Sequence, residues 1–127
     1  MMVAKIDVKL APEPEVVTTA RHTLDQLANL LPSEKLEDVR LMVSELVTNS
    51  ILHAGLSPDD KISLTVTVSD GAVRGSVCDP GPGFGIPSEP CPRPDLSGGW
   101  GLPIVQMISD RWGVERNRRA CVWFEID

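Results

Sequence analysis

The stretch ELVTNSILH, residues 45–53, lies within a longer segment, residues 34–54, whose apolar side chains recur at the spacing of an α-helix. Glu45, Asn49 and His53 stand four residues apart, so each lies about 40° further round the helix than the one before it. This polar stripe falls between a second apolar pair, Leu41 and Leu52, and the core-facing positions, which are Val39, Val43, Leu46, Val47, Ser50 and Ile51. A carboxylate and an amide flanked in this way are typical of a pocket wall, although a solvated helix face has the same spacing.

The segments on either side of this helix indicate further strands and helices. Strands are expected where apolar residues alternate with polar ones, and helices where they recur every three or four residues. The expected elements are a strand over residues 3–10, a helix from Pro14 to Leu31, the helix of residues 34–54, strands over residues 61–68 and 73–78 joined at Asp70-Gly71, a long Pro- and Gly-rich loop over residues 80–99, a helix over residues 102–108, and a hairpin of residues 112–115 and 121–126. This order predicts an α+β fold, a two-layer α/β sandwich whose mixed, mostly antiparallel sheet is covered on one face by three helices.

Composition limits the class of protein. The chain has 127 residues, of which 42% are hydrophobic, so it is long enough to bury one core. It carries 18 acidic and 12 basic residues and no basic block, which argues against nucleic-acid binding because phosphate neutralisation needs clustered Lys and Arg. No apolar stretch is long enough to span a membrane. A single globular domain that binds neither nucleic acid nor membrane is expected.

The cysteines point to a reducing compartment. Cys78, Cys91 and Cys121 cannot all pair, and none of them has the CxxC spacing of a zinc or redox site. The alternating first ten residues do not form a signal-peptide core. A reduced, cytoplasmic protein without a structural metal is therefore expected.

Two glycine-containing segments are candidates for ligand binding. Asp79 follows a predicted strand and precedes a stiff turn in which Gly81 and Gly83 alternate with prolines, so a ligand ring could approach the backbone while the carboxylate accepts a hydrogen bond from an amine. The same residues also suit an ordinary turn. The second segment, residues 98–102, places glycines at a helix start, where free backbone N–H groups suit phosphate, although a flexible joint has the same composition.

The order and spacing of the three motifs resemble those of the GHKL nucleotide-binding fold, the ATPase domain of histidine kinases, gyrase-type topoisomerases and the anti-sigma-factor serine kinases. Residues 45–54 are similar to the N box of the last group, E-L-V-x-N-A-x-x-H-A, with Ser50 in place of the usual alanine. Residues 79–83 resemble its G1 box and residues 99–102 its G2 box. The resemblance covers nearly the whole chain and implies one histidine-kinase-like ATPase domain over residues 1–127.

This resemblance implies roles for the matching residues. Asn49 would ligate Mg²⁺ beside the ATP phosphates, and Glu45 would be the catalytic base that deprotonates an attacking hydroxyl. Asp79 would recognise the adenine amino group, and Gly81 and Gly83 would let the purine approach.

The remaining residues implied by the resemblance lie around the phosphates and the ATP lid of about residues 84–98. Gly99, Gly101 and Leu102 would supply backbone that faces the phosphates, and Arg93 would be the single cation of the lid. His53 would support the lid or the phosphates, and Cys121 would be a partner of the adenine-binding carboxylate. Cys121 stands where the family commonly has a threonine that supports this carboxylate, and a thiol is a weaker hydrogen-bond partner. The replacement of alanine by Ser50 is expected to be a mild change in a packed position.

The implied activity is that of an anti-sigma-factor serine kinase, an enzyme that sequesters a sigma factor and uses Mg-ATP to phosphorylate a serine on an antagonist protein. Its expected partners are the sigma factor, the antagonist and ATP or ADP, with a possible second copy of the chain. The alternative is a nucleotide-gated binding module without phosphotransfer, which the single-cation lid and Cys121 favour. A scaffold that binds no nucleotide is the third reading of the same residues.

Overall fold

A computed structural model describes residues 3–53, 55–80, 102–116 and 119–127. Its elements in chain order are β1 (Val3–Leu10), α1 (Val16–Thr23), the 3₁₀ helix η1 (Leu24–Leu27), α2 (Ser33–His53), β2 (Ile62–Ser69), β3 (Ala72–Asp79), α3 (Leu102–Ile108), β4 (Arg111–Arg116) and β5 (Ala120–Ile126). No helix within these ranges is long and apolar enough to cross a membrane.

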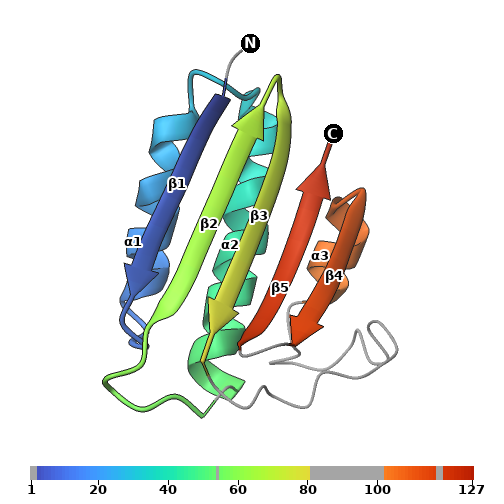
Figure 1. The fold of residues 1–127 in the computed structure, drawn as a ribbon. Coiled ribbons are helices and arrows are strands. Elements are labelled where there is room, and N and C mark those ends of the chain that lie inside the picture. The colour runs from blue at the N-terminus through green and yellow to red at the C-terminus, as the bar shows by residue number, and fades with distance from the viewer. Residues whose placement is uncertain (1–2, 54, 81–101, 117–118) are drawn as a thin grey trace.

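The five strands form one sheet in the order β1-β2-β3-β5-β4. All four strand pairings in the described ranges are antiparallel, so the expected antiparallel character is confirmed, whereas the expectation of a mixed sheet is wrong for this part of the chain. Figure 1 shows α1, α2 and α3 on the same side of the sheet. The structure is therefore the predicted two-layer α+β sandwich, with one face of the sheet covered by helices and the other left open.

The helix expected from Pro14 to Leu31 is two elements instead of one. It runs as α1 to Thr23 and then tightens into η1. A 3₁₀ helix has three residues per turn, so Leu24 and Leu27 lie on the same side of η1. Both side chains are fully buried. The tighter winding thus keeps two large apolar side chains in the core, which a pattern of helical spacing does not distinguish from a continuous α-helix.

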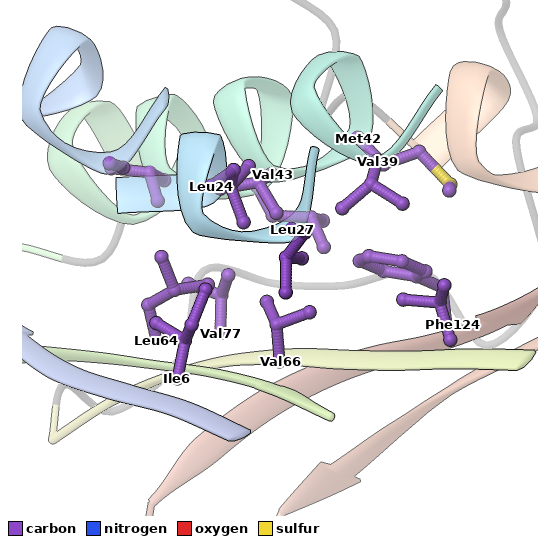
Figure 2. Close-up of a cluster of buried hydrophobic side chains, with 14 of the residues drawn as sticks. Ile6, Leu24, Leu27, Val39, Met42, Val43, Leu64, Val66, Val77 and Phe124 are labelled. Atoms are coloured by element: carbon purple, nitrogen blue, oxygen red, sulfur yellow. The ribbon is translucent and has the colours of Figure 1, made fainter. Parts of the chain in front are cut away.

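The hydrophobic core lies between the helices and the sheet. Alternate residues of each strand face the helices, because successive side chains of a strand point to opposite faces. Figure 2 shows Ile6, Leu64, Val66, Val77 and Phe124 on the sheet opposite side chains of η1 and α2. The α2 side chains that the sequence predicts to face the core include Val39, Val43, Leu46 and Val47, and the structure buries all four.

A glycine in β3 makes room for the largest buried side chain. Gly75 pairs with Phe124 of β5, and a Cβ atom added at Gly75 would lie 2.4 Å from Cζ of the Phe124 ring. Phe124 is fully buried, so its ring cannot move out into solvent. The aromatic ring therefore packs directly over the backbone of the neighbouring strand.

The substitution Gly75→Ala tests this contact. We expect it to lower the free energy of unfolding by about 1–3 kcal/mol, the usual cost of overpacking a core, as measured by urea denaturation. The same substitution in a Phe124→Leu background should cost less, because the shorter side chain leaves space for the new methyl group. An equal cost in both backgrounds would show that the glycine is required for a different reason.

Candidate functional site

A buried hydrogen bond joins the helix layer to the end of a central strand. Ser50 of α2 donates through Oγ to Oδ2 of Asp79, the last residue of β3, at 2.9 Å. The side chains are almost completely inaccessible, with Ser50 3% and Asp79 1% exposed. A carboxylate removed from water in this way depends on hydrogen-bond donors, so Ser50 helps to hold Asp79 in one position.

This role of Ser50 is the feature that the sequence analysis missed. The replacement of alanine by Ser50 was expected to be a mild change, but the hydroxyl is a direct partner of the predicted adenine-binding carboxylate. A signal was present in the sequence, since a serine on the core-facing arc of α2 is a polar residue that needs a partner. The pattern alone does not say which residue provides it.

Asn49 is adjacent to Ser50 and is also buried, with 2% of its surface exposed. Its side-chain nitrogen has no hydrogen-bond partner in the part of the chain that the structure describes. An unpaired buried amide costs about 1–3 kcal/mol, and buried polar groups are rarely left in that state unless a ligand or water pairs with them. Asn49 is thus a candidate ligand contact on grounds of geometry.

Glu45 lies one helical turn before Asn49 and is half-buried. No described side chain forms an ion pair or hydrogen bond with its carboxylate. The apolar residues expected to flank the stripe, Leu41 and Leu52, are exposed, Leu52 to 63%. Within the described part of the stripe, Glu45 is half-buried and Asn49 is buried, and the expectation of apolar residues that form a wall on the second side of the stripe is wrong for Leu41 and Leu52.

Several predicted site residues lie outside the described part of the chain. These are Gly81, Gly83, Arg93, Gly99 and Gly101, together with the predicted ATP lid of residues 84–98. The backbone of His53 ends α2 and that of Leu102 begins α3, but their side chains are not described. The structure describes the side chains of Glu45, Asn49, Asp79 and Cys121, and Ser50, the residue after Asn49, joins α2 to Asp79. The other predicted site residues stay predictions.

Cys121 does not support Asp79. Its sulfur is bonded to that of Cys78 in a disulfide, so the expectation that the cysteines are reduced is also wrong for this pair. Cys78 and Asp79 are neighbours on β3, and their side chains point to opposite faces of the sheet. The disulfide lies on the open face of the sheet, whereas Asp79 faces α2. There Ser50 donates to the carboxylate of Asp79 the hydrogen bond that was predicted for the side chain at position 121.

Comparisons with known proteins agree with this architecture. The family model of the histidine kinase-like ATPase domain matches residues 10–126. An anti-sigma F factor of Clostridium botulinum is 35% identical over 100 residues, which cover 72% of this chain and 70% of the relative. A serine-protein kinase RsbW of Oceanobacillus iheyensis is 28% identical over 119 residues, which cover 83% of this chain and 75% of the relative.

A solved structure shows the same fold. The crystal structure of the RsbU and RsbW domains of a Mycobacterium tuberculosis protein superimposes with a TM-score of 0.74 at 19% identity, covering 97% of this chain and 32% of that one. At this level of identity the likeness concerns the fold alone.

The substitution Ser50→Ala tests the buried hydrogen bond. We expect it to lower the free energy of unfolding by about 1–3 kcal/mol, because it removes a donor from a carboxylate that water cannot reach. Ser44→Ala is the matched control, since Ser44 lies on the same helix and its hydroxyl bonds only to Arg21 and the carbonyl oxygen of Arg40. Equal losses in urea denaturation of the two variants would mean that the contact with Asp79 has no special weight.

Proposed function

The chain belongs to the histidine kinase-like ATPase domain family, and from this premise we propose that it is an ATP-dependent protein serine kinase that also holds a sigma factor inactive. The names of its relatives, serine-protein kinase RsbW and anti-sigma F factor, support this activity. One observation carries the proposal for the site. A single helix, α2, carries Glu45 and Asn49, which lack side-chain partners for the carboxylate and the amide nitrogen among the described residues, and its next residue, Ser50, bonds to the buried carboxylate of Asp79.

Asp79 is the proposed adenine-binding residue. A carboxylate offers about four acceptor sites on its two oxygens, so it retains acceptor capacity while Ser50 donates to Oδ2. An adenine amino group is a donor and fits such a carboxylate, whereas the carbonyl that guanine carries at the same ring position is an acceptor and would face it unfavourably. Asp79 thereby favours ATP over GTP.

Asn49 is the proposed Mg²⁺ ligand through its side-chain oxygen, whereas the unpaired nitrogen, a hydrogen-bond donor, would pair with an acceptor such as a phosphate oxygen. Within the described residues no group of three or more His, Cys, Asp or Glu side chains is placed to hold a metal. Magnesium commonly binds one or two protein oxygens together with phosphate and water oxygens, so a single buried amide suits it. When bound, the ion neutralises charge on the phosphates of ATP.

Glu45 is the proposed general base. Its half-buried carboxylate has no competing cation among the described residues, so it can accept the proton of a serine hydroxyl that attacks the γ-phosphate. One helical turn from Asn49, Glu45 would lie on the phosphate side of the proposed site. Proton acceptance and nucleotide binding are thus assigned to different residues of the same helix.

The rest of the proposed site follows the family motifs. Gly81 and Gly83 would admit the purine, the backbone of Gly99, Gly101 and Leu102 would face the phosphates, and His53 and Arg93 would support the lid of residues 84–98. We propose further that residues 1–127 act as one domain, that the protein works in the cytoplasm, and that its partners are a sigma factor, an antagonist protein and a second copy of the chain.

A phosphotransfer assay tests the function. The purified protein is incubated with Mg²⁺ and ATP labelled at the γ-phosphate, together with small bacterial antagonist proteins, and we expect label to appear on a serine of one of them. A parallel pull-down should retain a sigma factor in a manner that depends on nucleotide. Sigma-factor binding that depends on nucleotide, without any phosphotransfer, would instead identify the nucleotide-gated binding module.

The substitution Asn49→Ala tests the magnesium site without relying on activity. A ligand that binds only the folded state stabilises it by about 2.7 kcal/mol at ~100 times its Kd, so Mg-ATP should raise the melting temperature of the parent protein. We expect the variant to lose the part of this rise that depends on Mg²⁺. Thr48→Ala, a neighbouring half-buried position on α2, should keep it. The same Mg²⁺-dependent rise in Asn49→Ala as in the parent would remove Asn49 from the metal site.

The substitution Glu45→Gln separates catalysis from binding. It keeps the shape of the side chain but removes its capacity to accept a proton, so we expect phosphotransfer to fall by about 10²–10⁴ while the affinity for ATP changes little. Glu37→Gln is the control, because Glu37 is an exposed carboxylate on the same helix. Full activity of Glu45→Gln in the labelled-ATP assay would assign the base to another group.

A further inference from the structure

The Cys78–Cys121 disulfide joins two central strands at the end of the sheet where Asp79 lies. It links β3 to β5 between residues that are 43 positions apart in sequence. The two cysteines are opposite each other in the antiparallel register, and the following pair, Asp79 with Ala120, is the last of the β3–β5 ladder. The covalent bond is therefore one residue away from the proposed adenine-binding carboxylate.

The sulfur atoms lie on the open face of the sheet, where small solutes can reach them. Both cysteines are half-buried, and no helix covers this face in Figure 1. Asp79 points to the opposite face and is shielded by α2. A reductant or oxidant can thus act on the sulfurs without entering the nucleotide site, and the effect passes through the backbone of residues 78 and 79.

Cationic side chains lie beside the pair. Lys9 and Arg119 both donate hydrogen bonds to the hydroxyl of Ser63, the residue opposite Cys78 on β2, and Arg119 also lies 3.5 Å from the carbonyl oxygen of Cys78. Nearby positive charge favours the thiolate form of a reduced cysteine, which is the form that reacts. Exposed Glu115 is opposite Cys121 on β4 and opposes this effect on that side, so Cys78 is the better placed of the two to react first.

We propose that Cys78 and Cys121 form a reversible oxidative modification site that sets how firmly Asp79 is held for nucleotide binding. The inference rests on the proposed function in two respects, the role of Asp79 and the cytoplasmic location. Disulfides in a reducing cytosol are usually transient, catalytic or redox-sensing and not structural. A disulfide beside the nucleotide site of a cytoplasmic kinase is accordingly one that changes with the oxidant level.

The oxidising step is balanced with hydrogen peroxide as the oxidant. The Cys78 thiolate attacks one peroxide oxygen, breaks the O–O bond and becomes a sulfenic acid as hydroxide leaves. The Cys121 thiol then attacks the sulfenic sulfur, which forms the S–S bond and releases water. Two electrons leave the two sulfurs, and the peroxide with the two thiol protons becomes two water molecules. A dithiol reverses the reaction by two exchange steps and is itself oxidised to a disulfide.

The expected consequence is tighter nucleotide binding in the oxidised form. The disulfide closes the end of the β3–β5 ladder, so the backbone that carries Asp79 has fewer conformations to lose when a ligand binds. In the reduced protein the terminal pair, Asp79 with Ala120, lacks this covalent constraint, while the ladder and the contact with Ser50 remain. Reduction therefore loosens the carboxylate without removing any group from the site.

The experiment compares the fully oxidised and the fully reduced protein. One sample is treated with hydrogen peroxide and the other with dithiothreitol, the thiol state is verified by alkylation and mass spectrometry, and the Kd for Mg-ATP is measured by calorimetry. We expect the oxidised protein to bind roughly threefold to tenfold more tightly. The Cys78→Ser/Cys121→Ser double variant should bind like the reduced parent under both conditions, and Cys91→Ser should retain the full difference.

A second measurement uses no nucleotide. Amide hydrogen exchange at the end of the β3–β5 ladder should be faster in the reduced protein than in the oxidised one. If neither form binds ATP, the proposed nucleotide site fails while a difference in exchange still supports the redox control of the ladder. Equal exchange and equal ATP affinity in the two forms would overturn the inference. It would also be overturned if peroxide did not form the disulfide, or if Cys91→Ser alone abolished the difference in ATP affinity between the oxidised and the reduced protein.

Discussion

The buried hydrogen bond between Ser50 and Asp79 is the contact on which the proposed site depends. It joins α2, which carries the polar stripe, to the end of β3, and the two partners are almost completely inaccessible to water. Inside a protein an unpaired carboxylate is far more costly than in water, so this contact constrains both elements to one relative position. Asn49 and Glu45 then take their places relative to Asp79 because the helix is rigid between them.

The alternation of side chains along β3 and β5 separates two kinds of chemistry. Residues that face the helices belong to the core or to the proposed nucleotide site, whereas those on the open face carry the disulfide and charged groups. At the other end of this face Arg74 lies 4.5 Å from the centre of the Trp123 ring, and Arg111 and Arg74 lower the pKa of Glu125 by hydrogen bonding to it. A change at a sulfur atom therefore reaches the site through the strand backbone and not through side-chain contact.

Hydrophobic periodicity was sufficient to predict α2, the strands and the coverage of one sheet face, because each of these depends on a local pattern. It could not predict the contacts that depend on tertiary packing. Cys78 meets Cys121 only through the β3–β5 register, and Ser50 meets Asp79 only through the packing of α2 on β3. The glycine motifs and the lid stay predictions, since they lie outside the described residues. The resemblance to a family predicted the candidate residues, but its N-box pattern has an alanine where this chain has Ser50, so the pattern does not predict the serine–carboxylate pair.

The residues that break the rules of a well-packed core are the ones assigned to function. Most of the buried positions of α2 are apolar, yet two adjacent ones are Asn49, without a partner for its nitrogen among the described residues, and Ser50. Each costs stability that an apolar residue would not, and such costs persist in proteins mainly where a ligand or a mechanism requires them. Because both deviations are adjacent to each other and close to a buried carboxylate, they indicate one site and not scattered imperfections. The large apolar core built around Phe124 offsets this local cost, so the fold can tolerate a buried amide nitrogen that has no partner among the described residues.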